Sequence, residues 1–225
     1  MGAICPSTEV DAGLRERILD RIIRPAVRGL REEGSPYRGV LYAGIMLVPA
    51  GASTGAIASP DAVTPMTLEF NARFGDPETQ VLLPRVADDL VELFAEVAAG
   101  SLSPGRASVA SVPGASACVV LTARGYPGPP ELGHVIAGLD APGFPEGAVV
   151  FHAGTRSVEG RLVTSGGRVL AVSALGSDLH EALERAESGA SRISFEGMHR
   201  RRDIGRDALD RLTARRGILT NRGNA

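Results

Sequence analysis

Hydrophobic positions near the N-terminus recur with the period of a helix. Leu14, Ile18 and Ile22 lie on one face of such a helix, and Asp11 is placed to cap its first turn. Pro25 cannot donate a backbone hydrogen bond, so the helix either kinks there or a second helix begins. The N-terminal region is therefore predicted to be helical.

The next apolar run has the period of a strand. Residues 38–48, RGVLYAGIMLV, are apolar at both alternating positions, which is typical of a central strand covered on both sides. Residues 49–65 are rich in Gly, Ala, Ser and Pro and predict an enlarged connection between two strands. Strand character returns at residues 66–70, MTLEF.

A helix and a linker are predicted to follow. Asp76 can cap a helix whose first position is Pro77, and apolar positions continue at helical spacing as far as Gly100. Residues 101–114 are rich in Ser, Pro and Gly, which is typical of a linker. We therefore expect a first domain over residues 1–100.

The second half of the chain alternates short strand-like runs with Gly and Pro clusters. The runs cover residues 115–123, 147–154 and 166–176. A helix is expected from Asp178 to Ile193, with Ser177 as its cap. Periodicity is lost beyond about residue 205, as in fraying termini. The fold class is α+β, with a β-rich domain over 115–205 and a tail over 206–225.

Composition excludes several functions. The formal net charge is -2, so we expect no nucleic-acid partner. All 24 basic residues are arginines, which excludes Schiff-base lysines and a P-loop lysine from this chain. Cys5 and Cys118 lack metal-binding spacing, and neither an export signal nor a membrane-spanning run is present. We expect a cytoplasmic protein without membrane contact.

Glu69 and Asn71 are the candidate metal ligands. They lie two positions apart on a predicted strand, so both side chains point to one face and offer oxygen atoms to a magnesium-type cation. Arg73 continues this parity if the strand persists, and its guanidinium suits a phosphate or carboxylate. An exposed sheet face with a Glu–Arg cross-pair has the same spacing. Spacing alone leaves both interpretations open.

Other polar residues are interpreted as structural. The arginine run at 200–202 lies near acidic residues and is typical of a solvated or packing face. The four histidines are scattered, without a catalytic or metal-binding motif: His134, His152, His180 and His199. No residue presents itself as a general base.

The letters around the candidate ligands decide between the two interpretations. Residues 68–84, LEFNARFGDPETQVLLP, closely resemble the signature stretch of phosphoribosylamine–glycine ligases. The resemblance implies that Glu69 and Asn71 ligate the Mg2+ or Mn2+ that bridges ATP phosphates. It implies that Arg73 is a catalytic residue, and it adds no other cofactor-binding residue.

Further segments resemble the same family in the same order. They are YRGVLYAGIM at 37–46, SACVVLTARGYPG at 116–128, VVFHAGT at 149–155, GGRVLAVSALG at 166–176 and ISFEGMHRRRDIG at 193–205. By this resemblance, the first hundred residues form the C-terminal part of an ATP-grasp domain. A small β-rich domain follows it.

The resemblance implies an activity. The family joins glycine to 5-phosphoribosylamine at the expense of ATP, through glycyl phosphate, and forms glycinamide ribonucleotide in de novo purine synthesis. The opening MGAICPST resembles the family's internal GGMGAYSP segment, so we expect that an N-terminal half with ATP-holding lysines is missing and that this chain is inactive alone.

Two alternatives remain. In the first alternative, the chain is a non-catalytic remnant or split subunit that binds a separate chain carrying the missing half. Such a chain should expose apolar surface. A weaker alternative is an ATP-grasp ligase of another specificity, against which the C-terminal segments argue.

Overall fold

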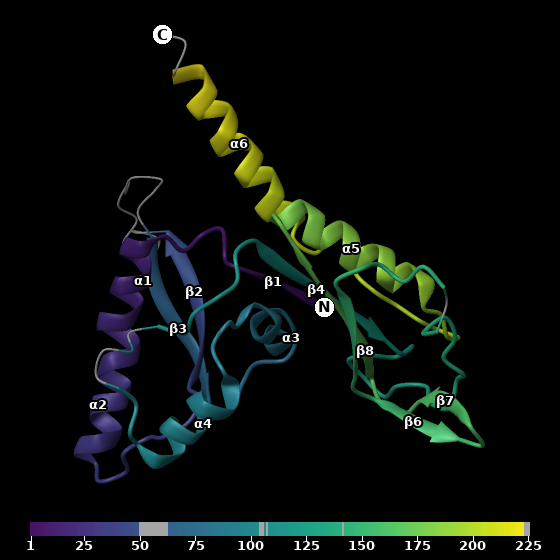
Figure 1. Cartoon of the computed structure of the whole chain (residues 1–225), viewed down its shortest axis with the longest axis horizontal. Coiled ribbons are helices and arrows are strands. Elements are labelled where there is room, and N and C mark those ends of the chain that lie inside the picture. Colours follow the sequence, from purple (N-terminus) through teal and green to yellow (C-terminus); the bar gives the residue numbers. More distant parts are fainter. Residues whose placement is uncertain (50–62, 104–105, 107, 141, 223–225) are drawn as a thin grey trace. The chain divides into compact units, whose positions relative to one another are not determined.

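The computed structural model describes the backbone of residues 1–49, 63–103, 106, 108–140 and 142–222, and side chains as far as residue 214. The chain divides into two compact units (Figure 1). The C-terminal unit contains Met1–Thr8, Asp76–Asp88 and Val109–Ala225, and the N-terminal unit contains Glu9–Gly75 and Asp89–Ser108. Segments 1–8 and 76–88 thus pack with the C-terminal unit, and the domain limits drawn from the sequence stay a prediction.

A four-stranded antiparallel sheet forms the centre of the C-terminal unit. Its strands, in spatial order, are β1 (Gly2–Cys5), β4 (Ala115–Thr122), β8 (Arg168–Gly176) and β5 (Ala148–His152). Every residue of β4 is buried. The apolar runs at 115, 147 and 166 therefore form strands as predicted, whereas β1 was not predicted.

Both faces of this sheet are covered. Helix α5 (Leu179–Arg192) packs on β4 and β8 through a row of small residues that includes Ala182, Ala186 and Ala190. On the other face, Val81 of helix α3 (Glu78–Leu82) packs against Cys118 and Val120. The burial of β4 follows from having both neighbouring strands and both faces covered.

The C-terminal unit also contains the two-stranded sheet of β6 (Thr155–Val158) and β7 (Arg161–Thr164), and helix α6 (Arg206–Arg222). The expected fraying tail after residue 205 is wrong over this helix. Its first turns pack Ala208, Leu209 and Leu212 against the core that α5 covers. The segment as a whole lacks a helical period, so these few partly buried positions did not stand out in the sequence.

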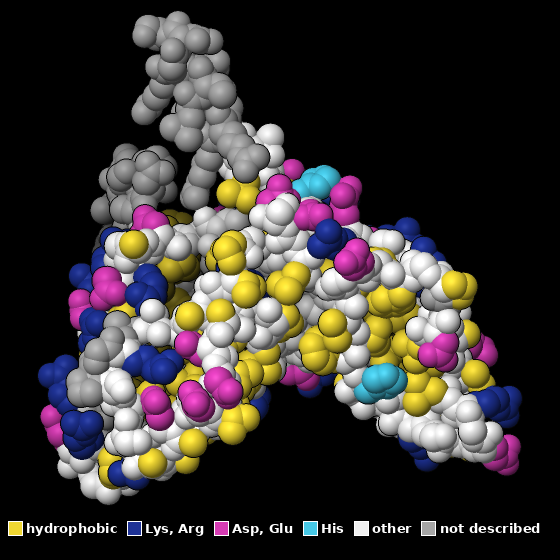
Figure 2. Space-filling model, viewed as in Figure 1, with side chains coloured by type: hydrophobic (Ala, Val, Ile, Leu, Met, Phe, Trp, Pro, Cys, Tyr) yellow, Lys and Arg dark blue, Asp and Glu magenta, His cyan; other side chains and the backbone are white. Residues whose placement is uncertain are grey.

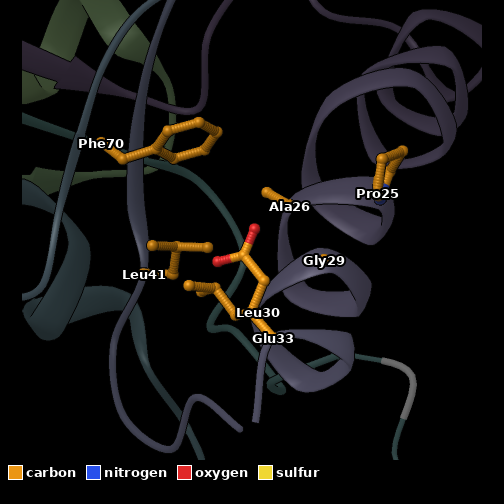
Figure 3. A pocket seen from close by; sticks show the side chains of 7 residues that line it. All are labelled: Pro25, Ala26, Gly29, Leu30, Glu33, Leu41 and Phe70. Atoms are coloured by element: carbon orange, nitrogen blue, oxygen red, sulfur yellow. The ribbon is translucent and has the colours of Figure 1, made fainter. Parts of the chain in front are cut away.

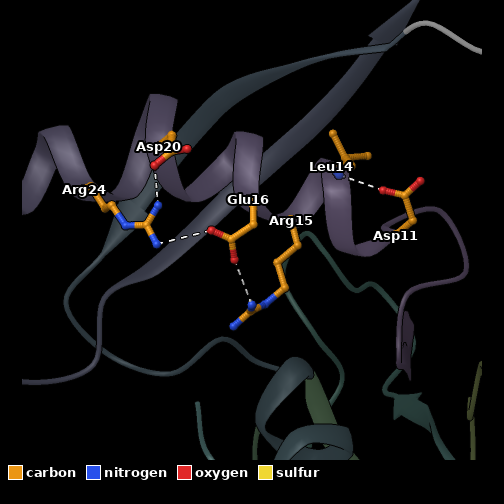
Figure 4. Close-up of polar contacts among 6 residues, drawn as sticks. All are labelled: Asp11, Leu14, Arg15, Glu16, Asp20 and Arg24. Carbon is orange, nitrogen blue, oxygen red and sulfur yellow. Dashed lines mark hydrogen bonds and ion pairs between the residues drawn. The ribbon is translucent and has the colours of Figure 1, made fainter. Parts of the chain in front are cut away.

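The N-terminal unit begins with a helical segment in three parts: α1 (Ala12–Ile18), the π-helical turn η1 (Leu19–Ile23) and α2 (Arg24–Glu32). The Asp11 carboxylate accepts the Leu14 backbone N–H at 2.7 Å, which confirms the predicted cap (Figure 4). Pro25 lies in the first turn of α2, directly after the π-helical turn, and the backbone stays helical through both, so the irregular turn accompanies the missing Pro25 N–H. The ion pairs of Arg24 with Glu16 and Asp20 are exposed and contribute little to stability.

Strands β2 (Tyr42–Pro49) and β3 (Val63–Asn71) form a two-stranded antiparallel sheet. The predicted central strand, covered on both sides, is wrong: every residue of β2 is half-buried or exposed, and Met46 is 50% exposed. Apolar residues at both alternating positions indicate that a strand favours burial. They do not show that neighbouring strands or covering helices are present. Most of the predicted connection at 49–65 lies outside the described residues.

The predicted helix from Pro77 to Gly100 is interrupted. Pro84 lies in a short 3-10 turn, η2 (Leu83–Arg85), and Val86 then bridges to Ser111 in extended conformation. Helix α4 (Leu90–Ala99) starts afresh with Asp89 as its cap and ends at Gly100 with a φ of 70°. Asp76 is not a cap, because its carboxylate accepts from the Gln80 amide at 3.0 Å and pairs with Arg168 at 3.2 Å.

Surface charges of both signs are interspersed on the face that Figure 2 shows, in line with the formal net charge of -2. Within the described part of the chain, no helix combines the length and the apolar character that a membrane crossing requires.

Candidate functional site

The two predicted ligands meet at the end of β3. The Asn71 side-chain amide donates a hydrogen bond to Glu69 Oε1 at 2.8 Å, so both side chains lie on one face of the strand. Glu69 is exposed and Asn71 is half-buried. The pair therefore presents a carboxylate and an amide side by side.

A β-bulge determines which face they occupy. Gly44 lies opposite Glu69, whereas the next residue, Ile45, lies opposite Thr67, so Leu68 is an extra residue in β3. Residues directly opposite one another share a face, and alternate residues of one strand do too. Because Met46 lies opposite Met66, Glu69 and Asn71 share their face with these two methionines.

The opposite face of the sheet looks toward a cavity. Phe70, opposite Ala43, lines a cavity of about 410 Å3 together with Leu41 and residues of α2 (Figure 3). The Glu33 carboxylate points into the space between α2 and Leu41 in this view. Phe70 alternates with Glu69 and Asn71, so the candidate ligands point away from this cavity.

Arg73 does not continue the parity of the ligands, because β3 ends at Asn71 and residues 72 and 73 form a bend. The exposed Arg73 guanidinium donates to the Phe74 carbonyl at 2.9 Å. The Phe74 ring packs near Phe94 of α4, with their centroids 6.1 Å apart. The segment after the strand is thus held by Phe74, while the Arg73 side chain stays in solvent.

The ligand pair fits a hard cation such as Mg2+ or Mn2+. Among the described residues, no group of three or more His, Cys, Asp and Glu side chains could hold a metal. Mg2+ is usually bound through one or two protein oxygens and keeps waters or substrate phosphates in its other positions. Glu69 has such an oxygen facing solvent, and turning the terminal torsion of Asn71 presents Oδ1. Their role as ligands stays a proposal.

The remaining candidates make local contacts. His134 lies 3.6 Å from a Glu131 oxygen and 3.5 Å from a Glu196 oxygen, and His152 Nδ1 lies 3.0 Å from the Thr155 hydroxyl. His180 Nδ1 lies 3.5 Å from a Glu184 oxygen, and the backbone of His199 pairs with that of Thr122. Two of the three arginines at 200–202 pair with acids, Arg200 with Glu187 at 2.6 Å and Arg201 with Asp203 at 2.7 Å.

The thiol of Cys118 is fully buried in β4. Burial raises its pKa to about 12, with the Asp76 and Glu78 charges adding to the rise. A thiol with this pKa is protonated at neutral pH and is a poor nucleophile. Cys118 is therefore a core residue.

Two domain models match this chain. Residues 1–79 match "Phosphoribosylglycinamide synthetase, ATP-grasp (A) domain", and residues 116–207 match "Phosphoribosylglycinamide synthetase, C domain". The first range contains Glu69, Asn71 and Arg73. The matches also follow the order that the sequence resemblance predicted.

Similar proteins carry the same family name. The phosphoribosylamine–glycine ligase of Vibrio vulnificus is 43% identical over 211 residues, which cover 94% of this chain and 46% of the relative. The crystal structure of the Thermotoga maritima phosphoribosylamine–glycine ligase is 35% identical, with a TM-score of 0.72, over 91% of this chain and 46% of that one. This chain thus spans about half the length of these relatives.

The fold also resembles a more distant protein. The biotin carboxylase domain of the Hydrogenobacter thermophilus 2-oxoglutarate carboxylase is 18% identical, with a TM-score of 0.59, over 89% of this chain and 40% of that one. This likeness concerns the α+β fold alone. With the two domain matches and the ligase relatives, the findings show that the chain belongs to the phosphoribosylamine–glycine ligase family, also called phosphoribosylglycinamide synthetases.

Proposed function

We propose that this chain contributes to the ATP-dependent ligation of glycine to 5-phosphoribosylamine, which yields glycinamide ribonucleotide in de novo purine synthesis. The chain spans 46% of the Vibrio relative, so we assign it part of the catalytic apparatus. The remainder corresponds to the part of the relative that this chain does not match. A cytoplasmic location is part of the proposal and agrees with the free thiols of Cys5 and Cys118.

The meeting of Glu69 and Asn71 carries this proposal. Both residues lie in the segment matched to the ATP-grasp domain, and both side chains point to a face that is open in the N-terminal unit. Mg2+ or Mn2+ bound there would supply positive charge to the phosphates of ATP. Glu69 would hold the cation through its carboxylate, and Asn71 would hold it through its side-chain Oδ1.

Arg73 would act beside this pair. Its exposed guanidinium is bonded only to the neighbouring Phe74 carbonyl among the contacts described above, and its long side chain can turn toward a phosphate or carboxylate. Its role is electrostatic, to stabilise negative charge on the phosphoryl group as it passes from ATP to glycine. Nothing in this scheme requires a general base from the chain.

A chimera tests the activity. The part of the Vibrio vulnificus ligase that this chain does not match is joined to the chain, and the product is assayed with ATP, glycine and fresh 5-phosphoribosylamine. We expect glycinamide ribonucleotide from the chimera and none from the chain alone. Glu69→Gln should lower kcat of the chimera about a hundredfold or more, as loss of a charge-stabilising group does.

Glu32→Gln is the matched control, because Glu32 is an exposed carboxylate at the end of α2. It should leave kcat unchanged. A chimera that folds and makes no product would refute the activity. Rapid turnover by the chain alone would refute its dependence on the unmatched part of the ligase. Full activity of Glu69→Gln would refute the assignment of Glu69 as a metal ligand.

A second candidate function is partner binding without catalysis. It is favoured by exposed apolar side chains of the two-stranded sheet: Met46 at 50%, Met66 at 52% and Leu68 at 62%. Exposed apolar side chains grouped on neighbouring strands mark interaction surfaces when they form a patch. If the chimera is inactive, a complex between this chain and the unmatched part of the ligase, seen by size-exclusion chromatography, would support this function.

A further inference from the structure

Gly44 lies directly opposite Glu69 at the β-bulge. A Cβ atom placed on Gly44 would lie 3.2 Å from Glu69 Cγ and 3.7 Å from Leu68 Cβ. The first distance is tighter than ordinary van der Waals contact, and the second is ordinary. The only close conflict is therefore with the side chain that carries the candidate metal-binding carboxylate.

The backbone at this position does not call for glycine. Gly44 is not among the glycines with positive φ, and it lies within a paired strand where glycine is usually unfavourable. Alanine would lose less backbone entropy than glycine when the strand forms. The space beside Glu69 is then what a side chain at position 44 would take.

The position of Cγ governs where the carboxylate lies. Rotation about the Cα–Cβ bond of Glu69 sets Cγ, and Cγ sets Oε1, which accepts from Asn71 at 2.8 Å. A methyl group on residue 44 requires Cγ of Glu69 to move by a few tenths of an ångström or to take another rotamer. Either change shifts the Glu69 carboxylate relative to the Asn71 amide.

We propose that Gly44 is a positioning residue for the metal site, because its missing side chain lets Glu69 adopt the rotamer that meets Asn71. The inference rests on the proposed function for the identity of the ligand. The placement of Glu69 by Gly44 does not depend on it.

The test compares wild-type protein with Gly44→Ala by NMR, using Mn2+ alone as the probe. Bound Mn2+ should selectively broaden the signals of residues 69–71 in the wild type. In Gly44→Ala the Mn2+ concentration needed for the same broadening should rise about tenfold or more, as when residues that orient metal ligands are changed. Without Mn2+, the nuclear Overhauser contact between the Glu69 Cγ protons and the Asn71 side-chain amide should be weaker than in the wild type.

Folding is monitored in the same samples. Thermal unfolding of Gly44→Ala should occur at the same or a higher temperature, because alanine is better tolerated in a strand than glycine. Gly29→Ala is the matched control, since a Cβ on Gly29 meets nothing within 4 Å. It should leave both the Mn2+ response and the Overhauser contact at wild-type values.

The outcomes separate the two claims. If Gly44→Ala keeps the Overhauser contact and the Mn2+ response, the positioning role is refuted. If the wild type shows the contact without broadening at 69–71, the metal assignment fails, and the Overhauser contact in Gly44→Ala still decides the role of Gly44. Loss of the folded state in Gly44→Ala would also refute it, because the change is expected to be compatible with the strand.

Discussion

Individual side chains in this protein differ widely in solvent exposure. The Glu69 carboxylate faces solvent beside Asn71, whereas the Cys118 thiol lies among apolar side chains with none of its surface exposed. Desolvation disfavours a charged group, so the exposed carboxylate is free to bind a cation and the buried thiol stays protonated. The two residues mark a candidate site and a core.

The Cys118 pKa predicts a fall in stability at alkaline pH. The thiol ionises near its ordinary value of 9.0 in the unfolded chain but only near about 12 in the folded protein. The unfolded state therefore loses this proton first, and the free energy of unfolding should fall as pH rises from about 9 to about 12. Urea unfolding against pH measures the effect, and Cys118→Ala should weaken it. An equal slope in both proteins would contradict the assignment.

Elements form where local signals and packing agree. Asp11, Asp89 and Asp178 each accept a backbone N–H in the first turn of the helix that follows. At α5 the cap differs from the sequence prediction, because Asp178 accepts from Glu181 N at 3.0 Å. Ser177 instead donates its backbone N–H and its hydroxyl to the Glu181 carboxylate, each at 2.7 Å.

This arrangement predicts unequal effects of two neighbouring substitutions. Asp178→Ala should lower the free energy of unfolding of the C-terminal unit by about 1 kcal/mol, the usual cost of losing a helix cap. Ser177→Ala should cost less, because the backbone N–H of residue 177 still donates to Glu181. Denaturant titration of both variants measures the difference. A larger loss of unfolding free energy for Ser177→Ala than for Asp178→Ala would show that Ser177 is the cap.

At the scale of the whole molecule, the two units differ in how completely their strands are covered. Strand β4 has a strand on each side and helices on both faces, and each of its residues is buried. Strand β2 pairs with β3 alone within the described residues, and its residues are half-buried or exposed. Opening should cost more free energy in the first case, because more apolar surface is exposed to water.

Hydrogen exchange on the full chain measures this difference. Amides at 116–122 and 169–174 should exchange slowly, and amides at 43–48 should exchange faster. Glycine substitution at buried Leu170 should accelerate the first two segments together, because they belong to one sheet. Equal protection of β2 and β4, lost in a single transition, would mean that the chain unfolds as one cooperative unit.

The sequence predicts which residues form the candidate site, but it does not predict how they are arranged in space. The signature stretch around Glu69 and Asn71 identifies both candidate ligands, and their spacing places them on one face of a strand. The bulge at Leu68 and the end of the strand at Asn71 were not predictable, because both depend on pairing with β2. These two features decide which face the ligands occupy and why Arg73 leaves it.

The sequence by itself determined the family, the α+β class, the three long strand runs of the C-terminal unit and the cap at Asp11. Each of these depends on signals within a few residues, namely hydrophobic period, turn residues, a capping side chain and a signature stretch. Only the tertiary structure decided that residues 2–5 pair with 116–119, that no described residue of β2 is fully buried and that residues 206–222 form a helix. Those features depend on contacts between segments far apart in the chain, and a local pattern carries no record of which distant surface lies beside it.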